Sequence, residues 1–242
     1  VLDWELAGIG DPMRDLGWLC TNSWRFGRAD MPVGGFGHME DLLAGYESVS
    51  GRVVDHEHLR FWIVFGSFWW SVCCLIMADS YRSGDNRSVE RPAIGRRASE
   101  GQADCVALLI PGPRSLPTAS VTEDPLPRAE ELLASVAEFL VGDVAEELPP
   151  GKAYLARVAA NSVAIAAREA QLGSALLAAE HERLQCLPGL MAATRQALAR
   201  ALREGMALDT PGLAEHLRLS VYGQLAVDQP DYKVTEDLVT EA

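Results

Sequence analysis

The sequence predicts a mainly α-helical protein made of two parts joined by a proline-rich connector. All six tryptophans among the 242 residues lie at or before Trp70, whereas the later half is rich in alanine, leucine and glutamate. Apolar residues recur at helical spacing along most of both parts. Residues 110–127 hold five prolines together with serine and threonine, which is typical of an extended connector, and we place the boundary near residue 122.

Four segments are expected along the chain. They are a first helical domain at 1–110, a proline-rich linker at 111–127, a helical bundle domain at 128–230 and a tail at 231–242. Because 48% of the residues are hydrophobic, the chain is long enough for two modest domains that each have a core.

In the first part, Leu2 is expected to end a short strand that leads into a turn rich in glycine, aspartate and proline. Helical patterns follow near residues 13–23, 38–50, 55–80 and 88–109. Residues 61–78 carry no charge and reach the minimum length of a membrane span. Trp69 and Trp70 lie in the middle of this stretch and not at an interface, so a helix buried in the core is favoured over a membrane helix.

Glycines at 34, 35 and 37 indicate a loop. A phosphate cradle is the alternative, but no lysine follows and the spacing fits neither common glycine motif.

The second part is predicted to be almost entirely helical. Apolar stripes run through residues 132–148, 155–165, 175–184, 190–202 and 213–225. Pro149, Pro150 and Gly151 end the first of these runs, and Thr210 followed by Pro211 begins the last. These stripes predict a bundle of about five antiparallel helices.

The composition excludes some classes of partner and compartment. A formal charge of −13 with two lysines, Lys152 and Lys233, argues against binding to nucleic acid or anionic lipid. Five cysteines without a recurring spacing suggest neither a disulfide framework nor a zinc site, so we expect a cytoplasmic protein. No secretory signal is recognised at the start, and the opening on Val1 suggests that a further segment precedes it.

The most informative motif is the run VLDWELAGIGDPMRDL at residues 1–16. An aspartate follows a short apolar strand, and a Gly-Asp-Pro turn then leads to another aspartate that enters a helix. This order resembles the aminoglycoside phosphotransferase and kinase-like phosphotransferase family. The motifs at 88–91 and 94–97, with Glu100, extend the resemblance to about residues 1–110. It implies that the first domain is the helical C-lobe of a protein-kinase-like fold.

The resemblance also implies roles for individual residues. Asp3 would hold Mg²⁺ against the phosphates of ATP or GTP, and Asp15 would be a buried structural aspartate that anchors the catalytic loop. Asp11 and Pro12 would shape the approach to the helix. The alternatives are an ordinary turn or cap aspartate for Asp3 and a simple helix cap for Asp15.

Two arginines near the end of the first domain could have either a binding or a structural role. Arg96 and Arg97 could touch a phosphate, but a solvated or salt-bridged helix face is favoured.

The sequence also departs from the family pattern. Such an enzyme needs a lysine on the phosphates, a catalytic aspartate in a His-Gly-Asp loop and a following asparagine, yet no lysine occurs before Lys152 and that loop is absent from the sequence. No catalytic residue is therefore assigned. We expect the chain alone to be inactive and the parent protein to be an ATP- or GTP-dependent small-molecule phosphotransferase.

Two further expectations concern partners. A missing nucleotide lobe, or self-association, would cover apolar surface near Val1, Leu2 and Trp4. The alternative function is a non-catalytic helical interaction or regulatory module that partners a phosphotransferase or an acyl-group enzyme.

The second domain resembles an uncharacterised family of helical domains found with such phosphotransferases. The stretches at 157–169 and 225–230 carry this resemblance. The polar residues that could line a pocket are Asn161, Arg168, Glu169, Glu180 and His181. Glu180 and His181 are adjacent and so lack the spacing that puts two metal ligands on one helix face, which favours ordinary surface polarity.

Overall fold

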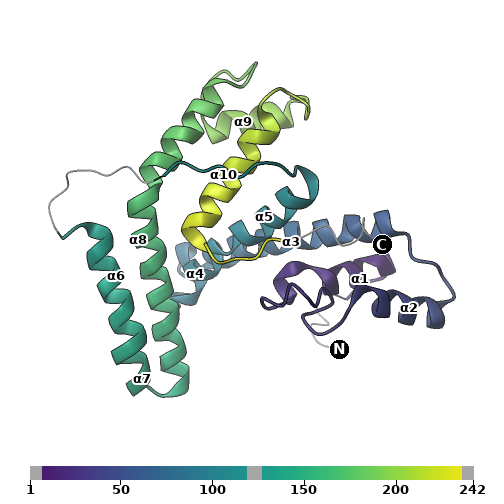
Figure 1. Ribbon diagram of the computed structural model, residues 1–242, viewed down its shortest axis with the longest axis horizontal. Helices are drawn as coiled ribbons and strands as arrows, with labels where there is room; N and C mark the ends of the chain where they lie inside the picture. The colour runs from purple at the N-terminus through teal and green to yellow at the C-terminus, as the bar shows by residue number, and fades with distance from the viewer. Residues whose placement is uncertain (1–6, 119–126, 236–242) are drawn as a thin grey trace.

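The computed structural model describes residues 7–118 and 127–235 (Figure 1). Within these two ranges the regular elements are helices, and the β-type pairing is limited to an isolated bridge between Val33 and Gly37. The mainly α-helical fold class is therefore confirmed. The predicted strand end at Leu2 lies outside the described residues.

Six helical elements form the first part: α1 (Pro12–Cys20), η2 (Asn22–Trp24), α2 (Met39–Ser50), α3 (His56–Ser83), α4 (Glu90–Arg96) and α5 (Ala98–Leu109). The predicted helix at 88–109 is thus two helices, interrupted at Arg97. The Ser99 hydroxyl donates to the Arg96 carbonyl at 3.0 Å and so satisfies a carbonyl near this interruption.

The helix α3 lies at the centre of the first part and packs against α1, α4 and α5. Its buried residues include Leu59, Ile63 and Cys74, whereas Phe61 and Phe68 are exposed. The predicted core helix is therefore buried on one side and exposed on the other. By length and composition α3 could cross a membrane, with a mean hydropathy of 1.9 over an 18-residue window that is 33% buried, but a core helix passes the same test.

The second part also consists of six helical elements: α6 (Ala129–Phe139), η3 (Leu140–Val144), α7 (Ala145–Glu147), α8 (Pro150–Gln185), α9 (Arg195–Arg203) and α10 (Leu213–Asp228). The two helices predicted at 155–165 and 175–184 are the single helix α8. The intervening residues hold no proline, and Gly173 is tolerated inside the helix.

The long helix α8 takes part in two separate apolar clusters, one near each of its ends (Figure 1). Near its start, Ala153 and Ala156 pack with Ala145. Near its end, Leu184 packs with Leu198 of α9 and with Leu213 at the start of α10. The second part is therefore two small clusters on one helix and not the single antiparallel bundle of five helices that the sequence predicts.

The first apolar stripe of the second part changes face along its length. Leu132 and Val136 of α6 are exposed, whereas Leu140 and Val144 of η3 are half-buried. The segment η3 is π-helical, and a π-helical turn contains an extra residue that rotates the following side chains. The spacing of four residues in the sequence therefore does not mark one continuous buried face.

Candidate functional site

Of the two aspartates assigned by family resemblance, the structure describes Asp15 and not Asp3. Asp3 lies outside the described residues, so its role as a metal ligand stays a prediction. Asp15 lies in the first turn of α1, and its side chain is exposed. The expectation that Asp15 is buried is therefore wrong for this chain, because the described residues place nothing over that side of α1. Its anchoring role stays a prediction.

The residue that caps α1 is Asp11. One of its carboxylate oxygens accepts a hydrogen bond from the Met13 backbone N–H at 2.9 Å, and Pro12 takes the first helical position. The other oxygen lies 2.6 Å from His58 Nε2 and accepts from the Trp62 indole N–H at 3.1 Å. These contacts tie the start of α1 to α3.

The hydrogen bond from Met13, with those from Trp62 and His58, lowers the pKa of the Asp11 carboxyl. Replacing Asp11 by alanine should therefore lower the melting temperature at neutral pH, whereas Asp15→Ala should leave it nearly unchanged. Because the pKa is lowered on folding, the Asp11 contribution is present above the ordinary aspartate pKa of about 3.9 and is lost as the pH falls through the folded-state value. Thermal melting at neutral and acidic pH checks both points, and equal melting temperatures for wild type and Asp11→Ala would contradict the capping role.

The amides of the glycine loop between η2 and α2 donate to backbone carbonyls of the loop and of α1. The Gly34 N–H donates to the Leu19 carbonyl at 3.0 Å, and the Gly35 N–H donates to the Met31 carbonyl at 3.1 Å. Both glycines have positive φ angles, which the turn requires. These amides are thus already used and do not form a phosphate cradle.

Arg96 and Arg97 both form ion pairs. The Arg97 guanidinium donates to the Glu100 carboxylate at 3.0 Å and lies 5.9 Å from the centre of the Trp70 ring. Arg96 reaches into the second part, where its Nε lies 2.8 Å from an Asp228 carboxylate oxygen and its guanidinium also pairs with Glu169. The favoured interpretation of a salt-bridged helix face therefore holds.

A buried carboxylate joins the two ends of the described chain. Asp104 of α5 is fully buried. It accepts hydrogen bonds from Asn22 Nδ2 at 2.9 Å, from the Tyr232 hydroxyl at 2.7 Å and from the Thr235 backbone N–H at 2.8 Å. Asn22 also donates to the Lys233 carbonyl at 2.9 Å. We call Asn22, Asp104, Tyr232 and Thr235 the buried joint.

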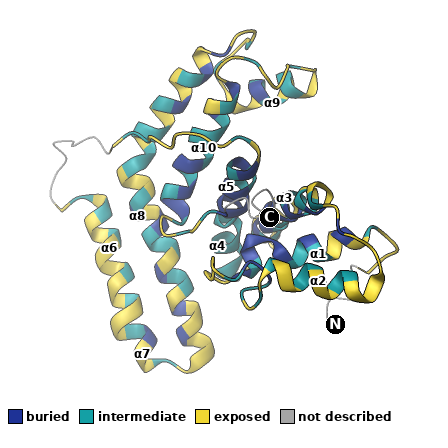
Figure 2. Ribbon diagram, turned by 45° about the vertical axis from the view of Figure 1, so that its right-hand side comes forward, coloured by how far each residue is buried: buried dark blue, intermediate teal, exposed yellow. Residues whose placement is uncertain are grey.

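Apolar contacts surround the buried joint. Most of α5 is buried (Figure 2), and Ala103 and Val106 on it pack with Tyr222 and Leu225 of α10. The Arg114 guanidinium lies 4.4 Å from the centre of the Tyr222 ring. The two parts of the chain therefore meet over a real core as well as through polar contacts.

The polar residues chosen from the second domain do not converge on one pocket. Arg168 of α8 donates to the Val227 carbonyl of α10 at 2.6 Å, within the second part, whereas Glu169 pairs with Arg96 and so joins the two parts. Glu180 forms a two-point ion pair with Arg195 at 2.6 Å. Asn161 and His181 are exposed on α8. Throughout 7–118 and 127–235, no three histidine, cysteine, aspartate or glutamate side chains gather as metal ligands.

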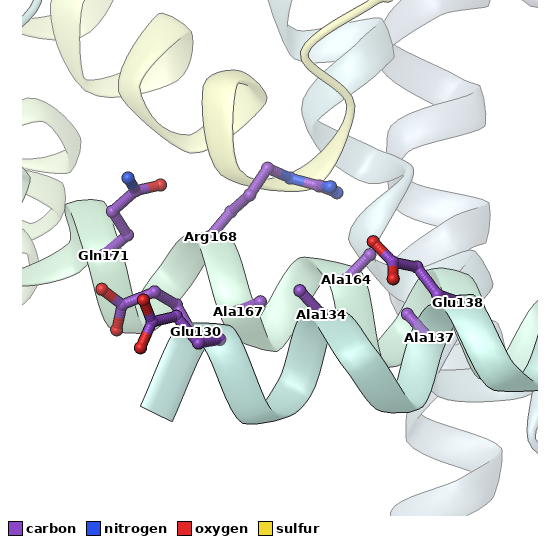
Figure 3. A pocket seen from close by; sticks show the side chains of 9 residues that line it. Glu130, Ala134, Ala137, Glu138, Ala164, Ala167, Arg168 and Gln171 are labelled. Atoms are coloured by element: carbon purple, nitrogen blue, oxygen red, sulfur yellow. The ribbon is translucent and has the colours of Figure 1, made fainter. Parts of the chain in front are cut away.

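A groove of about 460 Å³ runs between α6 and α8 (Figure 3). Alanines from both helices, including Ala134 and Ala164, form its floor, and Glu130, Glu138 and Arg168 stand around it. The small side chains leave this hollow between the two helices. It offers neither a nucleophile beside a base nor a set of metal ligands, so no catalytic chemistry follows from it.

Comparison with known families gives two separate matches. Residues 1–51 match the model described as the phosphotransferase enzyme family, and residues 146–232 match a domain of unknown function, DUF6285. The chain carries a phosphotransferase-family segment fused to a separate helical domain. Each match covers less than half of the chain, and the resemblance inferred over 1–110 is supported over its first 51 residues. No curated protein and no solved structure matches the chain.

The sequence reasoning missed the buried joint. Asp104 stands among small and apolar residues of α5, and a lone carboxylate in such a run was the available signal. Its partners are 82 and 128 residues away, at Asn22 and Tyr232, and no local spacing connects them. The match to the second domain ends at residue 232, so the helical domain reaches the joint.

Proposed function

We propose that this chain is the helical part of a kinase-like phosphotransferase that uses ATP or GTP with Mg²⁺ to modify a small molecule in the cytoplasm. The observation that carries the proposal is the family match over residues 1–51, which contains the Asp3 and Asp15 motif. The five cysteines are all free, in keeping with a reducing compartment.

We further propose that the chain alone does not transfer phosphoryl groups. Positioning and charge stabilisation supply nearly all of the catalysis in phosphoryl transfer, and they need a phosphate-binding lysine and a catalytic aspartate loop. The sequence has neither ahead of Lys152. A Mg²⁺ ion takes about six oxygen ligands, and the described residues gather no such set, so we derive no step through the ion.

A non-catalytic role for the helical domain is the second candidate. It is favoured by Glu169 and Asp228, which pair with Arg96 of the first part and do not line the groove between α6 and α8. In this proposal the domain supports or regulates a phosphotransferase lobe that it contacts.

Titration calorimetry with ATP·Mg²⁺ and GTP·Mg²⁺ on the purified chain tests the proposal, together with an assay of phosphoryl transfer. We expect weak nucleotide binding that Asp3→Ala abolishes and Asp11→Ala retains, with no turnover. Magnesium-dependent transfer by the pure chain would contradict its inactivity. Nucleotide binding that is equal in wild type and Asp3→Ala would contradict the metal role of Asp3, and no binding at all would favour the non-catalytic module.

A further inference from the structure

One face of α3 is apolar and uncovered by the described residues. Phe61, Phe68, Trp69, Leu75 and Ile76 are between 38% and 64% exposed, although each is large and apolar. The opposite side of the helix is buried against α1, α4 and α5. Exposed apolar surface of this extent on one element usually marks an interaction site.

The spacing on this face suits a second helix. Phe61, Phe65, Phe68, Val72 and Leu75 follow one another at intervals of four, three, four and three residues, which is the spacing of a coiled-coil seam. The rings form a continuous row, because Phe65 lies 6.3 Å from Phe61 and 6.2 Å from both Phe68 and Trp69 between ring centres. We call the five positions at this spacing, from Phe61 to Leu75, the α3 seam.

A lipid bilayer fits the seam less well than a helix does. From Phe61 to Ile76 the helix rises by about 23 Å, which is shorter than the hydrocarbon thickness of about 30 Å. The buried side of α3 also contacts protein along its length, and there Ser71 donates to the Ala98 carbonyl at 3.0 Å. The helix therefore presents one stripe, whereas a lone spanning helix is apolar all round.

We propose that the α3 seam binds the α3 seam of a second copy of this chain, with the two helices antiparallel. Glu57 is exposed near the start of α3, and near its end Arg82 is exposed and lies 3.6 Å from Asp79 of the same helix. If the two-fold axis of the dimer crosses the helices at the level of Trp70, Phe65 lies opposite Leu75 of the second copy and Phe68 lies opposite its Val72. Glu57 then lies within one residue of the level of Arg82 on the other helix, whereas parallel pairing would put like charges together.

The available area is enough for a dimer of modest affinity. Aromatic side chains bury about 150–250 Å² each when fully covered, and Leu and Ile side chains bury somewhat less. The five exposed side chains of α3 are Phe61, Phe68, Trp69, Leu75 and Ile76. Because each is about half exposed, together they supply on the order of 500 Å² per chain. The total of about 1,000 Å² is at the lower limit of specific interfaces. The dimer should therefore dissociate on dilution.

Light scattering and sedimentation equilibrium of the full chain, over a roughly hundredfold range of concentration, test the proposal. We expect twice the chain mass of 26.2 kDa at the high end. Phe68→Glu should give a monomer with an unchanged helical circular dichroism spectrum. The matched control is Val136→Glu, at an exposed apolar position of α6, which should dimerise as wild type does.

Cysteine cross-linking tests the direction of pairing. In a background with Cys73→Ser and Cys186→Ser, a mixture of Phe68→Cys and Val72→Cys chains should form a disulfide between the two chains, and neither variant alone should do so efficiently. Cross-linking of each variant with itself would overturn the antiparallel arrangement. A monomer at every concentration, a Phe68→Glu dimer, or flotation of wild type with neutral lipid vesicles would overturn the proposal. These readouts do not involve nucleotide, so they are independent of the proposed function.

Discussion

Replacing Asp104 by alanine is expected to lower the free energy of unfolding by about 3 kcal/mol, because several buried donors then lose their acceptor. Asn22 Nδ2, the Tyr232 hydroxyl and the Thr235 backbone N–H all donate to this one carboxylate, which is fully buried. The alanine also leaves a small cavity at the centre of the buried joint. Urea unfolding followed by circular dichroism measures the change.

Asp104→Asn is the matched variant. An asparagine keeps the shape and one acceptor oxygen, and its amide can donate to the Tyr232 oxygen, so the loss should be smaller than with alanine. Equal losses for the two variants would show that the acceptor oxygens do not stabilise the joint.

The pH dependence of stability, compared between wild type and Asp104→Asn, is a second test of the buried joint. Burial raises the pKa of Asp104 to about 6, and the hydrogen bonds from Thr235, Tyr232 and Asn22 oppose this only in part. A raised carboxyl pKa in the folded state means that Asp104 favours folding most below its unfolded-state value and that this contribution is lost as the pH rises through about 6. Wild-type stability minus that of Asp104→Asn should therefore fall between about pH 4 and pH 7. A difference that is flat across this range would contradict the shift.

The starts of several helices could be predicted from the sequence because the signals are local. Asp11 caps α1 and Pro12 is its first residue, and Thr210 and Pro211 lie two to three residues before the start of α10 at Leu213. The expected burial of Asp15 was wrong for a different reason. Burial depends on which other segments cover a helix, and a motif read in one dimension does not contain that information.

Positions that depend on long-range packing could not be predicted in this way. The stripe at Leu132 and Val136 has helical spacing, but the π-helical turn after α6 changes which side chains face α8. Likewise α3 is apolar all round in sequence, so its composition does not say which side is covered. In the structure, exposed side chains such as Phe68 identify the uncovered side of α3.

The buried joint changes how the two matched segments relate to each other. A proline-rich connector suggests two independent domains, yet Arg96 pairs with Asp228 and Asp104 binds Tyr232 across the two parts. Ion pairs that are buried on one side and hydrogen bonds to a buried carboxylate demand a fixed geometry. The second part therefore fixes the position of the first part, which is the physical basis for proposing a supporting or regulatory role.

Gly101→Ala is expected to destabilise the chain by about 2–3 kcal/mol, although alanine favours helix formation by about 1 kcal/mol over glycine. Gly101 lies at a close approach of α5 to α3, and a Cβ there would overlap the Ser67 carbonyl oxygen and lie 2.5 Å from Ser71 Oγ. The carbonyl is backbone, so relief requires the two helices to move apart. Gly45→Ala in α2 is the control, because a Cβ there meets nothing within 4 Å and should stabilise the chain by about 0.5–1 kcal/mol. Urea unfolding of both variants decides the matter, since stabilisation by both would mean that α3 and α5 are not held at this distance.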